Sequence, residues 1–256
     1  MNKVSIIGSG NVATHLAQGL FDSGITINQI FSRDIENAKS LAAKVNAEAI
    51  NTLSVLDTEA IDILLISVKD DVIKEVSKKI NSSNIVIAHT SGTIEMEALS
   101  NHQNFGVFYP LQTFSKNKEV DLSNIPFCIE GSDKNTKLAL LNLANQLSKD
   151  VRFIDSITRK SIHLSAVFAC NFSNHMLAIA DLLLKESGQD LSVLKPLVQE
   201  TISKAFDTSP SEGQTGPAAR NDQEVMQNHV TQLANQPQLQ DIYTTISESI
   251  KKFKNE

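Results

Sequence analysis

The sequence is poor in cysteine, has no excess of positive charge and shows no metal-ligand pattern. Its 256 residues include two cysteines, Cys128 and Cys170, each within an apolar pattern and without the spacing of metal-binding cysteines. We therefore expect two reduced core cysteines, no metal site and a cytoplasmic protein. The formal net charge of −6 at pH 7 argues against general binding of nucleic acid or of anionic membranes.

The hydropathy of the sequence also predicts neither a leader segment nor a membrane span. The first apolar run begins by residue 4, which leaves no room for a signal peptide. The most apolar long segment, 164–184, carries Asn171, Asn174, His175 and Asp181, so we expect it to be too polar to cross a membrane. With 41% hydrophobic and 20% charged residues, the chain has the composition of a soluble protein with one large domain or, better, two.

What the sequence does contain is a dinucleotide-binding pattern at its start. An apolar run ends at Gly8 and a helical pattern begins at Asn11, so a buried strand meets a helix across Gly-x-Gly-x-x-Ala. Gly8 permits the tight turn, and Gly10 lets the backbone approach a pyrophosphate at the positive end of the helix. We expect a cofactor site that includes Gly8, Ser9, Gly10, Asn11 and Val12. The alternative is a strand-to-helix turn without a ligand.

The end of the second predicted strand, 27–31, bears on the choice of cofactor. An NAD site places Asp or Glu there for the ribose 2′-hydroxyl, whereas an NADP site places Arg and small hydroxyls there for a 2′-phosphate. Ser32 and Arg33 fit the phosphate, and we expect Asp34 to cap a helix at 35–45. The pattern therefore favours NADP over NAD, although Asp34 turned inward would favour NAD.

Further strands and helices alternate up to residue 155 and predict a mostly parallel α/β sheet. In such sheets ligands bind at the carboxyl ends of the strands. We therefore expect cofactor contacts from Ser67 and Val68, which end the most apolar strand. The next strand runs into 89–93, a candidate for substrate contact in which His89 is either a proton donor or a structural histidine.

From residue 156 onward only helical periodicity is found, with predicted helices at 157–187, 192–206, 221–234 and 239–253. We expect a Rossmann dinucleotide-binding domain at 1–155 and an all-α domain for substrate binding and dimerisation at 156–256. The first of these helices is apolar on almost every side. Such a helix must be covered all round, which predicts a homodimer through the C-terminal helices.

Four motifs together resemble those of a known family: Gly-x-Gly-x-x-Ala at 8–13, His-Thr-Ser-Gly at 89–92, Tyr-Pro-Leu-Gln-Thr-Phe at 109–114 and Thr-Gly-Pro-Ala-Ala-Arg at 215–220. The chain is similar to bacterial NADP oxidoreductases that are distantly related to pyrroline-5-carboxylate reductases, ketopantoate reductases and β-hydroxyacid dehydrogenases. The resemblance implies a Rossmann-like domain followed by an all-α domain like the C-terminal one of 6-phosphogluconate dehydrogenase. It also implies that Pro110 contacts the cofactor and that Ser91 and Gln112 contact the substrate.

The long helix departs from the β-hydroxyacid dehydrogenases at one position. Those enzymes carry a catalytic lysine three residues before an asparagine, and the matching pair here is Asn171 and Asn174. At about 100° per residue, His163 falls in the same sector of the helix. Asn has no useful proton to give, so we expect the asparagines to position the substrate and the proton to come from water or His163.

Two classes of function follow. One is an NADP-dependent oxidoreductase that transfers a hydride between NADPH and a small C=O or C=N substrate bearing a carboxylate. Arg220 would clamp that carboxylate, unless it forms a surface or intersubunit salt bridge. The other is an NADP-binding regulatory or scaffold protein without turnover, which the missing lysine leaves open.

Overall fold

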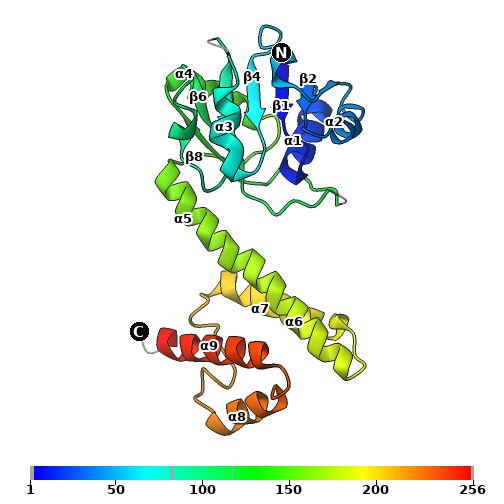
Figure 1. Cartoon of the computed structure of the whole chain (residues 1–256). Helices are drawn as coiled ribbons and strands as arrows, with labels where there is room; N and C mark the ends of the chain where they lie inside the picture. The colour runs from blue at the N-terminus through cyan, green and yellow to red at the C-terminus, as the bar shows by residue number, and fades with distance from the viewer. Residues whose placement is uncertain (1–2, 82–83, 117, 255–256) are drawn as a thin grey trace. The chain divides into compact units, whose positions relative to one another are not determined.

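The computed structural model describes residues 3–81, 84–116 and 118–254, and the chain divides into two compact units at residues 1–173 and 174–256. The first unit contains an eight-stranded sheet in the order β3-β2-β1-β4-β5-β6-β7-β8 (Figure 1). Neighbouring strands are parallel except for β6 and β7. The strands are β1 (Lys3–Ile7), β2 (Thr26–Phe31), β3 (Glu48–Ile50), β4 (Ile63–Ile66), β5 (Val86–His89), β6 (Phe105–Pro110), β7 (Phe127–Gly131) and β8 (Val151–Phe153). This order confirms the predicted Rossmann-type sheet.

Both faces of the sheet are covered, because successive side chains of a strand point to opposite faces. In β4, Ile63 and Leu65 join one apolar core while Leu64 and Ile66 join the other. The first core is shared with α1, α2 and α4, and the second with α3. These helices are α1 (Asn11–Asp22), α2 (Ile35–Ala42), α3 (Ile73–Lys78) and α4 (Lys134–Ala144). The continuous aliphatic run that predicted a central strand is thus explained by burial on two sides.

Local details confirm some expectations and correct others. Asp34 caps α2 by accepting a hydrogen bond from the N–H of Glu36, as predicted. Cys128 is buried in β7, but Cys170 is exposed, so the expectation of two core cysteines was wrong for Cys170. The motif at 109–114 begins in a strand, because β6 continues to Pro110 beside the antiparallel β7. A proline is tolerated there because the position is the end of the strand.

The predicted long helix is present and runs from Ser156 to Glu186. It consists of α5 (Ser156–Ala166), a π-helical segment η4 (Val167–Phe172) and α6 (Ser173–Glu186). The remaining helices of the second unit are α7 (Lys195–Asp207), α8 (Gln223–Gln232) and α9 (Pro237–Lys254). The change from strands to helices falls at the predicted place, whereas the compact units divide inside the helix, after Ser173. Helix α5 therefore belongs to the unit that contains the sheet.

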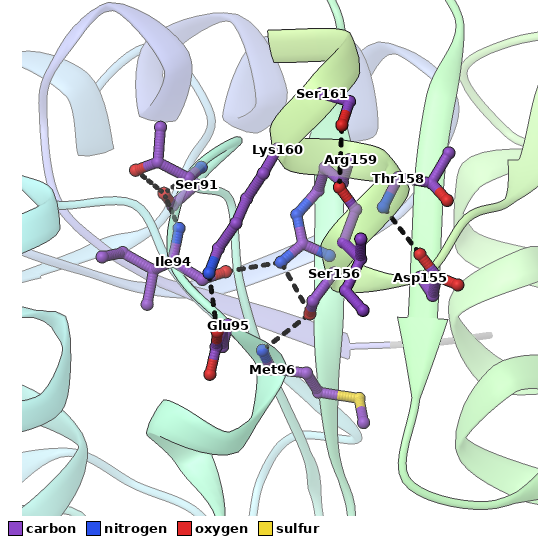
Figure 2. Close-up of polar contacts among 12 residues, drawn as sticks. Ser91, Ile94, Glu95, Met96, Asp155, Ser156, Thr158, Arg159, Lys160 and Ser161 are labelled. Carbon is purple, nitrogen blue, oxygen red and sulfur yellow. Dashed lines mark hydrogen bonds and ion pairs between the residues drawn. The ribbon is translucent and has the colours of Figure 1, made fainter. Parts of the chain in front are cut away.

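Polar contacts hold the start of α5 against the sheet. Arg159 is fully buried; its Nη1 donates to Glu130 Oε2 at 2.7 Å, and its Nη2 donates to the carbonyl oxygen of Ile94. Figure 2 shows Arg159 reaching from the helix to the Ile94 backbone, with Ser156 beside it. Ser156 Oγ accepts from the N–H of Met96 at 3.1 Å and donates to Glu130 at 2.7 Å. The guanidinium therefore links β7, the segment after β5 and α5.

We expect Arg159→Met to destabilise the first unit strongly. Met fills much of the same volume but leaves the Glu130 carboxylate without its cation, and breaking a mostly buried pair costs about 3–5 kcal/mol. The matched control is Arg152→Met, because Arg152 forms its ion pair with Asp150 on the surface and exposed pairs contribute little. Denaturant unfolding of both variants measures the difference. Equal midpoints for the two variants would show that the buried pair contributes nothing special.

Candidate active site

A cleft of about 800 Å³ lies at the carboxyl ends of the central strands. Its lining includes all ten predicted cofactor-binding residues: Gly8, Ser9, Gly10, Asn11, Val12, Ser32, Arg33, Ser67, Val68 and Pro110. Ser91, Gln112 and His163 also line it. The cleft opens where the chain leaves β1 for one side of the sheet and later enters β4 on the other, which is where doubly wound sheets bind ligands.

The glycines of the first turn meet the demands of a pyrophosphate site. Gly8 has φ +131°, and a Cβ added there would lie 2.0 Å from the carbonyl oxygen of Ser67. Gly10 is the N-cap of α1; no side chain caps the helix, and a Cβ at Gly10 would meet nothing within 4 Å. The backbone is therefore bare where phosphate oxygens would meet the first N–H groups of α1. These residues fit a dinucleotide.

Beside the first turn, three predicted residues and one unpredicted pair line the cleft. Ser9 Oγ donates to Ser32 Oγ at 3.0 Å, and Arg33 lies beside them in the lining. Glu75 and Lys79 also line the cleft and form an ion pair of 2.6 Å. The pKa of Glu75 is lowered, first by its hydrogen bond to Lys79 and to a smaller extent by Arg33. Sequence analysis missed this pair because only the packing of α3 brings it near β2.

The segment after β5 is held by its own hydroxyls. Thr90 Oγ1 donates to Ser67 Oγ at 3.1 Å, joining the ends of β5 and β4. Ser91 Oγ accepts hydrogen bonds of 3.0 Å from the N–H groups of Thr93 and Ile94. Ser91 therefore stabilises a turn with its lone pairs, and its Oγ also lies 3.4 Å from Thr93 Oγ1.

The burial and hydrogen bonds of His89 are those of a structural histidine. It is fully buried, its Nδ1 accepts from the N–H of Ser91 at 3.2 Å, and its Nε2 lies 3.3 Å from the carbonyl oxygen of Glu95. Burial, with a smaller contribution from Arg159, lowers the pKa of His89 to about 4. The imidazole is therefore neutral at pH 7, with both nitrogens engaged, and the structural alternative for His89 fits better than a proton donor.

Tyr109 and His163 meet at the edge of the cleft. Tyr109 Oη lies 3.0 Å from His163 Nδ1, and the two rings meet edge to face with centroids 6.0 Å apart. Burial raises the pKa of Tyr109 to about 12. Gly92 makes room for the pair, since a Cβ there would lie 2.5 Å from His163 Nδ1 and 2.8 Å from Tyr109 Cζ. Tyr109 begins the motif at 109–114, but no role was predicted for it from the sequence.

A second cavity, of about 520 Å³, adjoins the cleft and shares Tyr109, Gln112 and His163 with it. Asn171 lines this cavity together with other residues of α5 and η4. Its angular relation to His163 differs from the assumed 100° per residue, because η4 has the wider turns of a π-helix. Asn174 and Arg220 belong to the second unit.

The described residues, 3–81, 84–116 and 118–254, contain no group of three His, Cys, Asp or Glu side chains arranged to hold a metal ion. The cleft offers hydroxyls, the imidazole of His163, the charged side chains of Arg33, Lys69, Asp70, Asp71, Glu75 and Lys79, and a bare phosphate-binding turn. A dinucleotide cleft of this kind, joined to a second cavity for a small molecule, defines the class of nicotinamide-dependent oxidoreductases.

Comparisons with known proteins identify the family. Residues 3–92 match the model of a family described as NADP oxidoreductase, coenzyme F420-dependent, and residues 125–250 match a domain of unknown function, DUF2520. The crystal structure of BF3122 from Bacteroides fragilis, which is assigned as an NADP oxidoreductase, shares 40% identity over 98% of both chains with a TM-score of 0.92. The chain therefore belongs to this family of NADP-dependent oxidoreductases. No curated protein matches the sequence.

More distant structures share the fold. A reductive aminase from Aspergillus terreus, solved with NADPH, is 14% identical over 98% of this chain and 92% of its own, with a TM-score of 0.71. The 1-pyrroline-5-carboxylate reductase of Streptococcus pyogenes is 14% identical over 98% of both chains, with a TM-score of 0.59. At these identities the similarity shows the fold alone.

We expect Arg33→Ala to reduce the preference for NADPH over NADH about ten-fold or more. The variant loses a charge-assisted contact to the 2′-phosphate worth about 1.5–3 kcal/mol, which NADH does not use. Lys39→Ala is the control, because Lys39 carries the same charge but pairs with Glu36 on α2 and does not line the cleft. Calorimetric titration with both cofactors measures the effect, and equal affinities in the parent protein would contradict the assignment of Arg33.

Proposed function

We propose that this protein reduces the C=N or C=O bond of a small substrate with a hydride from NADPH. One observation carries the proposal: the dinucleotide cleft and the second cavity share Tyr109, Gln112 and His163. Groups able to donate hydrogen bonds thus lie where a substrate in the second cavity would face the cofactor. Bound NADPH supplies the hydride, and the residues of this chain must place the substrate and supply a proton.

The second cavity suits a substrate with an apolar body. Ile162, Ala166 and Val167 contribute to its lining, and the amide of Asn171 is positioned to orient a polar group. We propose that Asn171 positions the substrate, and we retain Asn174 for the same role. The names of the aminase and the pyrroline carboxylate reductase support a C=N substrate over a C=O one.

We further propose that the substrate bears a carboxylate, for which Arg220 is the candidate partner. Among the described residues that line the second cavity there is no lysine or arginine, so a carboxylate bound there needs a cation from elsewhere in the assembly. Arg220 is exposed in the second unit and is not held in an ion pair among the described residues. Its guanidinium is therefore available for a bidentate contact.

The test compares substrates that differ only in charge. We expect the protein to oxidise NADPH with 1-pyrroline-5-carboxylate and, with a higher KM, with 1-pyrroline. Arg220→Gln should raise the KM of the carboxylate at least ten-fold and leave that of the neutral ring unchanged. NADPH consumption followed at 340 nm with amine product analysis measures this. Tight NADPH binding without turnover of any imine or keto acid would instead support a regulatory or scaffold protein.

We also propose that the protein is a homodimer through its C-terminal helices. Helix residues with large apolar side chains are exposed along the long helix and α7, namely Leu164, Phe168, Phe172, Leu182, Leu197, Ile202 and Phe206. Within the described residues, Ser156–Glu186 is also the one helix long and apolar enough, by length and composition, to cross a membrane. A second copy covers such a surface without lipid, and large apolar patches are rare on monomers.

Light scattering in detergent-free buffer tests whether a second copy of the chain, rather than lipid, covers this apolar surface. We expect a particle of twice the 28.0 kDa chain mass at micromolar concentration. Phe206→Glu, at a residue 87% exposed, should shift the particle towards the monomer by placing a charge in the interface. Val55→Glu is the control, since Val55 is exposed to 57% and lies in the first unit and outside these helices in the sequence. A monomeric parent, or one recovered only with membranes, would refute the dimer.

A further inference from the structure

The contact between Tyr109 and His163 is the one place in the cleft where a hydroxyl meets a titratable imidazole. Tyr109 is 9% exposed, and its ring is held in β6 between Val107 and Cys128 of the neighbouring core cluster. His163 is half-buried on α5. Both residues line the cofactor cleft and the second cavity, so their polar atoms are placed where the two ligands would meet.

Two features of the fold support this contact. Gly92 lies against both rings, and any larger residue there would push Tyr109 and His163 apart. Arg159 lies one helical turn before His163 on the same side of α5, and its buried contacts to Glu130 and Ile94 fix the helix against the sheet. The 3.0 Å separation therefore does not depend on a mobile loop.

Several other polar groups that line the cleft are held by contacts of their own. His89 is buried and neutral, and the carboxylate of Asp70 accepts a hydrogen bond from Thr93 Oγ1. Asn171 has no proton to give. Ser91 has a hydroxyl that stabilises its own turn. Tyr109 is the remaining hydroxyl with a titratable partner in hydrogen-bond distance.

We propose that the Tyr109 hydroxyl donates the proton to the substrate and that His163 returns a proton to Tyr109. The inference rests on the proposed function and names the residue that completes it. As the hydride from NADPH joins the carbon of the C=N bond, the electron pair of that bond goes to nitrogen, which takes the proton from Tyr109 Oη. The phenolate takes the proton of the His163 imidazolium from Nδ1, and water later reprotonates His163. The sum is imine, NADPH and one proton giving amine and NADP⁺.

The direction of the hydrogen bond decides which protonation state is active. With neutral His163 the Tyr109 hydroxyl donates to Nδ1 and is turned away from the substrate. With imidazolium, Nδ1–H donates to Tyr109 Oη and frees the hydroxyl proton. The high pKa of Tyr109, caused mainly by burial with contributions from Cys128 and Asp70 and opposed by Arg159, keeps a phenolate from persisting. Only the imidazolium form of His163 therefore leaves the Tyr109 proton free for the substrate.

The decisive experiment pairs Tyr109→Phe with a substrate that needs no proton. Phe keeps the ring in β6 and removes only the hydroxyl. We expect kcat for 1-pyrroline to fall about 100-fold or more, in the range of general acid catalysis, with the Kd of NADPH unchanged. The N-methyl-1-pyrrolinium ion accepts hydride without a proton, so its reduction should change little. A merely structural role of Tyr109 would slow both substrates alike.

Tyr243→Phe is the matched control. Tyr243 of α9 makes the same kind of contact, with its Oη 2.9 Å from His229 Nδ1, but it lies in the second unit. It should leave both rates unchanged. His163→Gln keeps a hydrogen-bonding group beside Tyr109 but cannot return a proton to it, so it should lower kcat for 1-pyrroline.

A readout independent of turnover is the ¹⁵N NMR spectrum of the imidazoles in the NADP⁺-bound protein. Tyr109→Phe should move the Nδ1 resonance of His163, and Tyr243→Phe that of His229. An unmoved His163 resonance, or equal loss of rate with the imine and the iminium ion, overturns the proton-donor role while the proposed reductase stands. A parent that reduces neither ring overturns the proposed substrate class and this inference with it.

Discussion

The buried guanidinium of Arg159 is the interaction on which the rest of the candidate site depends. It has 0% side-chain exposure and donates to the Glu130 carboxylate and to the carbonyl oxygen of Ile94. A buried charge of this kind is tolerated only where its partners are fixed, because desolvation is costly. The pair therefore ties α5 to β7 and to the segment that follows β5. Without that link, His163 would have no defined distance from the strands.

At two positions a glycine shapes the site, because the lack of a side chain lets other groups approach closely. At Gly8 the missing Cβ leaves space for the carbonyl oxygen of Ser67, and the backbone adopts φ +131°, which favours glycine. At Gly92 the missing Cβ leaves space for Tyr109 and His163. One glycine thus shapes the cofactor end of the cleft and the other shapes the end where the cleft meets the second cavity. At both ends the close approach is possible because glycine has no side chain.

The sequence predicts the sheet well because its signals are local. The strand before Gly8, the run at Ile63–Ile66 and the cap at Asp34 each follow from residues next to one another, and all are present in the structure. The residues expected to bind the cofactor line one cleft, although ligand contacts stay predictions. The fold and the family follow from these patterns.

What the sequence could not predict depends on distant residues or on small changes of helix geometry. Tyr109 meets His163 across 54 positions of sequence, and no local pattern specifies such a pair. Cys170 was expected in the core because it lies within an apolar pattern, whereas it is exposed in the π-helical η4. A helical wheel at 100° per residue loses its phase through such a segment. The boundary between the two compact units, after Ser173, lies within one continuous helix, and the amino-acid composition gives no signal for it.

The position of the proton source follows from these constraints. A lysine on the long helix, as in the β-hydroxyacid dehydrogenases that the chain resembles, brings its own flexible ammonium to the substrate. In that resemblance Asn171 matches the position of the lysine and offers only an amide, so in the proposed reaction another group supplies the proton. Tyr109 is fixed in a strand, and its partner His163 is fixed on the helix by Arg159 one turn earlier. In the proposed site, Tyr109 and His163 are both held in place by the fold, and together they take the role of the single flexible lysine. That arrangement requires both the space at Gly92 and the buried charge at Arg159, and the fold provides the two together.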